Sequence, residues 1–168
     1  MLFSYYLQRG NNLSPFPDGL RMLTGNAYLR TSTNTTEAKM ITWLWCVLDW
    51  SQPSAVLMAH RSISNNGQTQ SQGLTKTDCD VSLRAQIFFP SCWDGVNLDS
   101  ADHKSHMAYP SQGDNGDCPS SHPVQLIALF YEIWYAVSPF NQLNDGGRFV
   151  LSNGDPTGMF SASSDDIC

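Results

Sequence analysis

The sequence of 168 residues is poor in charge, and its two signs are unequal. Charged residues make up 14% of the chain, against roughly 25% in soluble domains, and only three of them are lysines and two are glutamates. With a net charge of −6 and no cluster of basic residues, we expect no nucleic-acid partner and no polybasic membrane patch. No apolar run of about 18 residues occurs, so no membrane span is expected.

What the sequence has in abundance is turn-forming residues. Thirteen of its fifteen acidic residues are aspartates, and Asp, Asn, Ser and Gly favour turns and caps over helix interiors. Aromatic residues, 11% of the chain, favour strands. The chain is long enough for one domain with a core of its own. The composition therefore predicts a β-rich, loop-rich protein of secreted character.

Five cysteines occur without a CxxC pair, which excludes a zinc ribbon and a thioredoxin motif. The first four allow three pairings into two disulfides. We predict the sequential pairing, Cys46 with Cys79 and Cys92 with Cys118, because each pair brackets a loop. Cys168, the last residue, would then stay free.

Two further signals concern the compartment. The triplets Asn12-Leu13-Ser14 and Asn34-Thr35-Thr36 match the pattern for N-glycosylation, which fits a secreted protein. The N-terminus, however, lacks the basic region, the sustained apolar region and the cleavage site of a signal peptide. We interpret the chain as part of a longer secreted protein.

Alternation of apolar and polar residues predicts short strands. The clearest is 83–89, where Leu83, Ala85 and Ile87 would share one face. Residues 40–50 fit either a buried strand or a three-turn helix. The strands are expected near 2–8, 20–24, 83–89, 124–135 (two strands broken near Ala128) and 148–152. The predicted fold is mainly β, an antiparallel β-sandwich or jelly-roll-like pair of sheets, and an incomplete domain.

Three motifs together carry a family resemblance. They are FPSCWDG at 89–95 with LDS and DHKSH following at 98–106, CPSSHPV at 118–124, and FVLSNGDPTG at 149–158. The chain resembles the fungal secreted family called domain of unknown function 1996. The resemblance implies an extracellular location for the full-length protein and implies cell-wall or plant polysaccharide as the ligand. It implies no settled reaction.

The chain also departs from that family at both ends. It lacks the histidine-containing segment that precedes the domain in family members, and its residues 159–168 do not match their C-terminal segment. We therefore expect residues 1–158 to be a partial single domain and 159–168 to be an unmatched, disordered tail.

The candidate catalytic residues begin with Glu132, which lies in an aromatic, apolar run. A buried carboxylate needs a partner, and an apolar site raises its pKa toward that of a general acid. The alternative is an ion pair with an arginine of another strand, such as Arg84 or Arg148.

A second group of candidates lies in the loop that follows Trp93. His103 and His106 are near Asp94 and Asp102, and these residue types suit catalysis, sugar contact or a metal ion, whose presence stays open. The alternative is a loop whose Asp and His side chains hold turns by hydrogen bonds to the backbone.

Aromatic and turn residues complete the candidate site. Trp93 and Tyr109 are candidates to stack on sugar rings, whereas Trp134 is expected to pack in the core. The turn at 153–156 would place Asn153 and Asp155 at the edge of the site.

Two functions follow from these candidates. One is polysaccharide binding without catalysis. The other is a hydrolase or lyase with Glu132 paired to His103, His106 or Asp155 as acid and base. We expect Glu132 and the two histidines to share one polar concavity, because each would supply the other's partner. No cofactor is expected.

Overall fold

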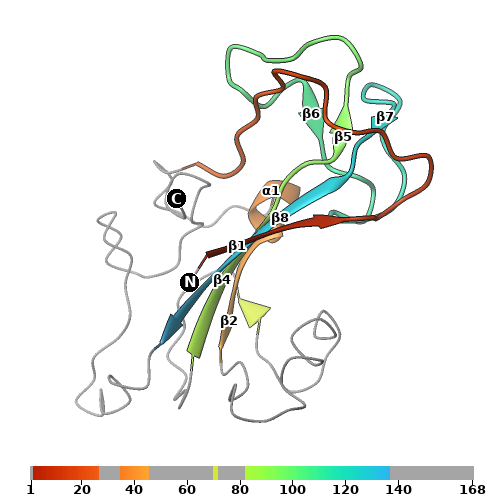
Figure 1. Cartoon of the computed structure of the whole chain (residues 1–168). Coiled ribbons are helices and arrows are strands. Elements are labelled where there is room, and N and C mark those ends of the chain that lie inside the picture. Colours follow the sequence, from red (N-terminus) through yellow and green to blue (C-terminus); the bar gives the residue numbers. More distant parts are fainter. Residues whose placement is uncertain (1, 27–34, 46–69, 72–81, 137–168) are drawn as a thin grey trace.

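The structure, a computed structural model, describes residues 2–26, 35–45, 70–71 and 82–136. Within these ranges the protein consists of antiparallel strands and one short helix (Figure 1), which confirms the mainly β prediction. In chain order the elements are β1 (Leu2–Leu7), α1 (Thr36–Met40), β2 (Ile41–Trp45), β3 (Gln70–Ser71), β4 (Ser82–Phe88), β5 (Cys92–Trp93), β6 (Met107–Ala108), β7 (Val124–Gln125) and β8 (Ala128–Ala136).

The larger sheet has five strands in the order β1-β8-β4-β2-β3. Its centre is the pairing of β4 with β8, in which Ala85 lies opposite Ile133 and Ile87 opposite Tyr131. The predicted strands at 2–8 and 83–89 are confirmed as β1 and β4. The aromatic stretch at 124–135 forms two strands that separate just before Ala128, as its aromatic content indicated.

The smaller sheet, β6-β5-β7, lies beyond one end of the larger one (Figure 1). Two chain segments run through both sheets, because β4 leads into β5 and β7 leads into β8. Three residues separate Phe88 from Cys92, but four separate their partners Gln125 and Phe130. Such an extra residue is a β-bulge, which bends the pair. Pro90 lies between Phe89, whose N–H donates to Leu129 O, and Ser91, whose carbonyl accepts from Leu126 N, and it has no N–H of its own to donate.

The apolar core lies on one face of the larger sheet. Leu83, Ala85 and Ile87 of β4 face it, and Ile87 is fully buried. Burying each large aliphatic side chain contributes roughly 1.5–3 kcal/mol. The other buried members are Ile41 and Phe89, and Met22, Leu129, Tyr131 and Ile133 pack against them. The alternation in β4 thus predicted this face correctly.

The predicted strand at 20–24 is wrong. This segment hydrogen-bonds to the irregular loop between β5 and β6 instead of a strand: Arg21 N donates to Leu98 O (2.9 Å) and Leu23 N donates to His103 O (2.9 Å). A strand needs a partner that follows it in regular register, and these two carbonyls belong to residues that are not in register along the loop.

The stretch at 40–50, left open by its sequence, forms strand β2 over its described part, after the short helix α1. The predicted strand at 148–152, the Cys46–Cys79 pair and the tail at 159–168 lie outside the described residues. No helix among the described residues is long and apolar enough to cross a membrane.

Candidate functional site

The histidine-containing loop between β5 and β6 is held by its own side chains. His103 Nδ1 lies 2.5 Å from Asp99 Oδ1, and Arg21 Nη1 lies 3.3 Å from the other carboxylate oxygen. The hydrogen bond from His103 lowers the pKa of Asp99. His103 has a positive φ of 55°, so its backbone forms the turn that its side chain then fixes.

His106 is 2% exposed and serves the same loop. Its Nε2 lies 2.6 Å from the Arg21 carbonyl oxygen, which only accepts, so Nε2 donates. Its Nδ1 lies 2.8 Å from Ser100 Oγ, and that hydroxyl lies 2.7 Å from Asp102 Oδ1. The ring therefore ties the N-terminal segment to the loop.

The Asp102 side chain holds the turn that follows it by hydrogen bonds. Its carboxylate accepts hydrogen bonds from the hydroxyl and the N–H of Ser105 and from the N–H of Lys104 (3.0 Å). These bonds, the one from the Ser105 hydroxyl first, lower the pKa of Asp102. Across the part of the chain that the structure describes, no three His, Cys, Asp or Glu side chains are placed to hold a metal ion. These hydrogen bonds match the alternative in which Asp and His side chains hold the turns of a loop, and a catalytic or sugar-binding role of these residues stays a prediction.

Trp93 and Asp94 form a similar local unit. Asp94 Oδ1 accepts from the N–H groups of Val96 and Asn97 at 2.9 Å each, and Trp93 Nε1 donates to Asn97 O (2.7 Å). The Trp93 ring is half-buried in β5. Its indole N–H is therefore committed to the 94–97 turn.

Tyr109 ties two segments together through its hydroxyl. That hydroxyl donates to Phe88 O (2.9 Å) and lies 2.6 Å from Thr24 Oγ1. Burial raises the pKa of Tyr109 well above its usual range. Stacking of the Tyr109 ring on a sugar would not require these two hydroxyl contacts to break, and that role stays a prediction.

Glu132 lies on the face of the larger sheet opposite the apolar core. Its Oε1 accepts from the Tyr5 hydroxyl (2.9 Å) and from Trp134 Nε1 (3.0 Å). Its Oε2 lies 3.2 Å from Arg84 Nη1, and both side chains are less than a tenth exposed. Of the two interpretations of this carboxylate, the structure contains the ion pair with Arg84. Arg84 Nη2 also donates to Gln86 Oε1 (2.8 Å).

The sequence-predicted site residues thus fall into separate places. Glu132 belongs to β8 of the larger sheet, while His103 and His106 belong to the loop before β6 of the smaller one. Within the described ranges, no hydrogen bond or ion pair joins Glu132 to either histidine. Asn153 and Asp155 lie outside the described residues. The shared concavity of Glu132 and the histidines stays a prediction.

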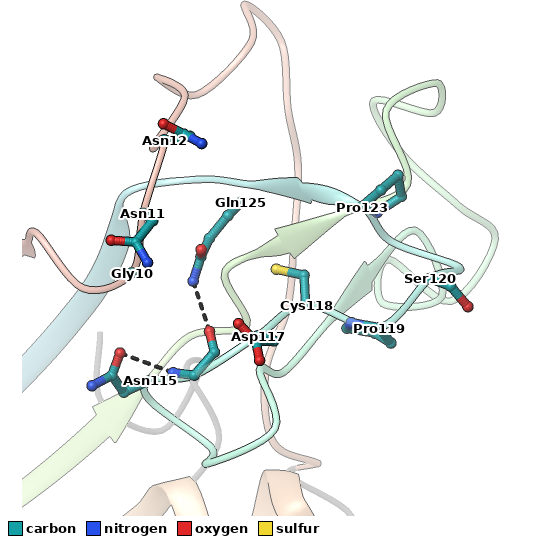
Figure 2. Close-up of a pocket in the computed structure, with 11 residues that line it drawn as sticks. Gly10, Asn11, Asn12, Asn115, Asp117, Cys118, Pro119, Ser120, Pro123 and Gln125 are labelled. Atoms are coloured by element: carbon teal, nitrogen blue, oxygen red, sulfur yellow. Dashed lines mark hydrogen bonds between the residues drawn. The ribbon is translucent and has the colours of Figure 1, made fainter.

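A pocket of about 430 Å³ lies elsewhere, between the segment after β1 and the segment before β7 (Figure 2). It is lined by Gly10, Asn11, Asn12, Asn115, Gly116, Asp117, Cys118, Pro119, Ser120, Pro123 and Gln125. Sequence reasoning missed it. The signal was two Asn/Gly turn clusters, but they are about a hundred residues apart along the chain, and a single sequence does not show that they meet.

Backbone geometry that only glycine adopts easily shapes the pocket. Gly10 has a φ of +100°, and a Cβ there would lie 2.2 Å from Gln125 Nε2. Gly116 has a φ of +95°, and a Cβ there would lie 2.4 Å from Ser111 Oγ. Gln125 Nε2 in turn donates to Gly116 O (3.1 Å), which links the two walls (Figure 2). Glycine allows both the left-handed backbone and this close approach.

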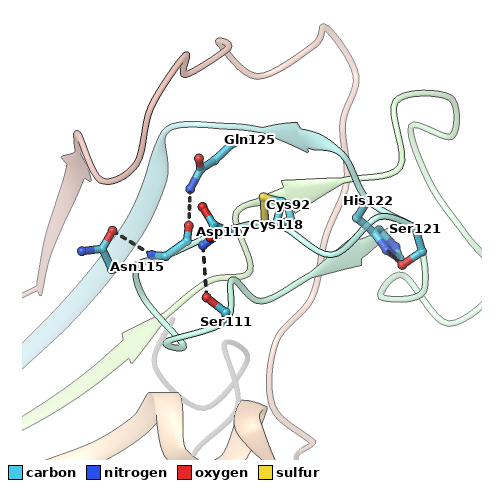
Figure 3. Close-up of a disulfide and its surroundings, with 9 residues drawn as sticks. Cys92, Ser111, Asn115, Asp117, Cys118, Ser121, His122 and Gln125 are labelled. Atoms are coloured by element: carbon cyan, nitrogen blue, oxygen red, sulfur yellow. Dashed lines mark hydrogen bonds between the residues drawn. A yellow bond between two sulfur atoms is a disulfide. The ribbon is translucent and has the colours of Figure 1, made fainter.

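A disulfide between Cys92 and Cys118 anchors one wall of the pocket to β5 (Figure 3). The Cα atoms are 5.6 Å apart, a normal separation, and the predicted pairing is confirmed. Beside it, Ser111 N donates to Asp117 O (2.9 Å) and Asp117 N donates to Ser111 Oγ (3.1 Å). The wall that carries Asp117 and Cys118 is thus fixed covalently and by hydrogen bonds.

The chemistry of the pocket is hydrogen bonding by neutral groups. Its lining offers the amides of three asparagines and one glutamine and the hydroxyl of Ser120. Asp117 is the one carboxylate among the residues that line it, and none of them is His, Glu, Lys or Arg. An amide both donates and accepts, so this lining suits a neutral ligand with many hydroxyl groups.

Comparison with known proteins identifies the family. A family model described as a domain of unknown function, DUF1996, matches residues 1–165, and the chain belongs to that family. The motif resemblance is thereby confirmed, and the match extends beyond residue 158. Separate comparisons with curated proteins and with solved structures gave no match.

Proposed function

We propose that this protein is an extracellular polysaccharide-binding domain and that the pocket beside the Cys92–Cys118 disulfide holds a sugar unit of the ligand. The observation that carries the proposal is the lining of neutral amides and a hydroxyl around a cavity of about 430 Å³. That volume lies in the range of small-molecule pockets, roughly 300–1,000 Å³. Sugars are neutral and dense in hydroxyls, and such a site selects ligands whose hydroxyls satisfy its polar groups.

The rigidity of the pocket supports binding. Its walls are joined by the bond from Gln125 to Gly116 O and by the disulfide at Cys118. A site that is ordered before the ligand arrives loses less conformational entropy on binding. A ligand that is held mainly by hydrogen bonds therefore binds more tightly to this ordered pocket than it would to a flexible one.

The disulfide also supports an extracellular location, because such bonds persist in oxidising compartments and are rare in the cytosol. Cell-wall or plant polysaccharide as the ligand rests on the resemblance to a fungal secreted family, which is an argument by analogy.

Binding is favoured over hydrolysis by the distribution of acidic groups. Glycoside hydrolysis ordinarily uses two carboxyl groups that flank the bond, whereas Asp117 alone lines the described pocket. The alternative, a hydrolase or lyase that uses Glu132 and a histidine as acid and base, would need Glu132 released from Arg84. Its carboxylate already accepts two hydrogen bonds, from Tyr5 and Trp134, and forms an ion pair with Arg84.

The proposal is tested by depletion from solution with insoluble chitin, β-glucan, cellulose and xylan, followed by calorimetry with soluble oligomers of any polysaccharide that binds. We expect Asn11→Ala and Asp117→Ala each to weaken binding about tenfold, the effect of one lost hydrogen bond worth ~1.4 kcal/mol.

Gln112→Ala is the matched control, because it removes an exposed amide from the same loop outside the pocket lining. Failure to bind any of these polysaccharides, or equal affinity in all three variants and the wild type, would overturn the proposal.

A further inference from the structure

The triplet Asn12-Leu13-Ser14 is a sequence motif that the proposed function does not use. The pattern marks an acceptor for N-glycosylation when the middle residue is not proline and the asparagine is at the surface of a secreted protein. The second triplet begins at Asn34, which lies outside the described residues.

The structure meets the surface condition at Asn12. The residue is exposed, lies in the bends after β1 and has a positive φ of 55°. The structure gives its side chain no hydrogen bond or ion pair with any described residue. A glycan on its amide nitrogen would therefore displace no contact among the described residues.

The chain on both sides of Asn12 is fixed against the pocket. Ser14 N donates to Gln125 O (2.8 Å), and Ile127 N donates to Ser14 O (3.1 Å). On the other side, the backbone of Gly10 packs against the Gln125 side chain. These contacts tie the backbone on both sides of Asn12 to the segment of Gln125, and so they fix where a glycan would be attached.

That place is the pocket itself. Asn12 is among the residues that line it, on the segment that faces the wall formed by Asn115, Asp117 and Cys118 (Figure 2). We propose that Asn12 is N-glycosylated and that the first sugars of this glycan lie across the pocket mouth, where they restrict access for the polysaccharide. The inference rests on the proposed function, since it needs passage through a secretory compartment.

N-glycosylation of Asn12 is the transfer of an oligosaccharide from a lipid carrier to the side-chain amide. A bond forms between Asn12 Nδ2 and C1 of an oligosaccharide, and the bond from C1 to the diphosphate of a lipid carrier breaks. The amide loses one proton to a base of the transferase, and the lipid diphosphate leaves with the electron pair. No oxidant or reductant takes part.

The first test measures the modification alone. The full chain is secreted from a glycosylating yeast behind a leader, and peptides are analysed by mass spectrometry before and after peptide-N-glycosidase, which leaves Asp at a formerly modified position. We expect Asn12 to be modified in the wild type and in Ser14→Thr, and unmodified in Ser14→Ala. An unmodified Asn12 in the secreted wild type overturns the proposal, whatever the protein binds.

The second test measures where the glycan lies and needs no ligand. Backbone amides of 115–118 and 120 are expected to exchange hydrogen more slowly in the glycosylated protein than in Ser14→Ala, while amides of β4 exchange equally in both. Ser14 does not line the pocket, so this variant removes the glycan without altering the lining. Equal exchange at 115–118 and 120 would overturn the placement across the pocket.

The third test connects the glycan to binding. If a polysaccharide binds the pocket, Ser14→Ala is expected to bind it at least threefold more tightly than the wild type, and Ser14→Thr to bind it equally. Equal affinity of Ser14→Ala and the glycosylated wild type would overturn the restriction of access. Failure of the proposed function appears differently, as absence of binding in all three proteins.

Discussion

Glu132 and Arg84 form a buried ion pair between neighbouring strands, with 3.2 Å between Oε2 and Nη1. The register places them diagonally, because Glu132 lies opposite Gln86 and Arg84 lies opposite Trp134. The Arg84 guanidinium also lies 5.4 Å from the centre of the Trp134 ring. This face of the sheet thus buries two opposite charges together with the polar side chain of Gln86.

Replacing Glu132 with Gln should destabilise the protein by about 3 kcal/mol, because the buried Arg84 charge then lacks its counter-charge. Urea unfolding followed by circular dichroism measures the loss. Asp117→Asn, at an exposed carboxylate, is the control and should change stability by less than about 0.5 kcal/mol.

The double variant Arg84→Met/Glu132→Leu should recover most of that loss, since it removes both buried charges together. A Glu132→Gln protein as stable as the wild type would contradict the structural role and would favour the acid–base alternative for Glu132.

The raised pKa of Tyr5 predicts that the protein loses stability at high pH. Burial, followed by its hydrogen bond to Glu132 and the Glu132 charge, raises the pKa of Tyr5 from 10.0 to about 12. The folded state keeps the phenol proton to higher pH than the unfolded chain, so the free energy of unfolding falls as the pH rises from 10 toward about 12.

The absorbance of the phenolate, titrated in the wild type and in Tyr5→Phe, isolates this group. The difference between the two curves should show one tyrosine that ionises clearly above pH 10. A difference curve with its midpoint at 10 would show that Tyr5 is not perturbed.

Removal of the Cys92–Cys118 disulfide should cost roughly 2–5 kcal/mol of stability, as for native disulfides of small secreted domains. The variant Cys92→Ser/Cys118→Ser is compared with the wild type by thermal unfolding. The pocket wall at Cys118 is expected to loosen as well, so binding of polysaccharide should weaken in the same variant. Cys168→Ser, at the cysteine predicted to be free, should leave the melting temperature unchanged.

Tyr109→Phe should cost about 1–2 kcal/mol. It removes the hydrogen bond to Phe88 O and takes a partner from the hydroxyl of Thr24, which is 1% exposed. Tyr6→Phe is the matched control, because Tyr6 is 64% exposed and its hydroxyl has no partner among the described residues. Equal stability of the two variants in urea would show that the Tyr109 hydroxyl does not hold these segments together.

Local pattern was sufficient for several elements. The alternation in 83–89 predicted β4, and the aromatic content of 124–135 predicted strands over a helix. The pairing of Cys92 with Cys118 followed from their bracketing of one loop. These features depend on residues that are close in sequence. The alternation of side chains determines which face of a strand is buried, and the length of a loop determines which cysteines can meet.

Local pattern failed where the partners are distant. The segment from Leu20 to Thr24 resembles a strand, but Arg21 and Leu23 donate to Leu98 and His103 of the loop between β5 and β6. The sequence offered Arg84 and Arg148 equally as partners of Glu132, and the register of β4 against β8 brings Arg84 to it.

The sequence by itself determined the class of fold, the main strands, one disulfide and the membership in the DUF1996 family, because alternation, turn residues and long motifs are local properties of the chain. The tertiary structure alone decided that both faces of β4 are buried, that His106 is bound to the carbonyl of Arg21, and that Asn12 meets Asp117 around one pocket. Each of these depends on how segments far apart in sequence pack together, and that packing is set by strand register and the bulge between the two sheets.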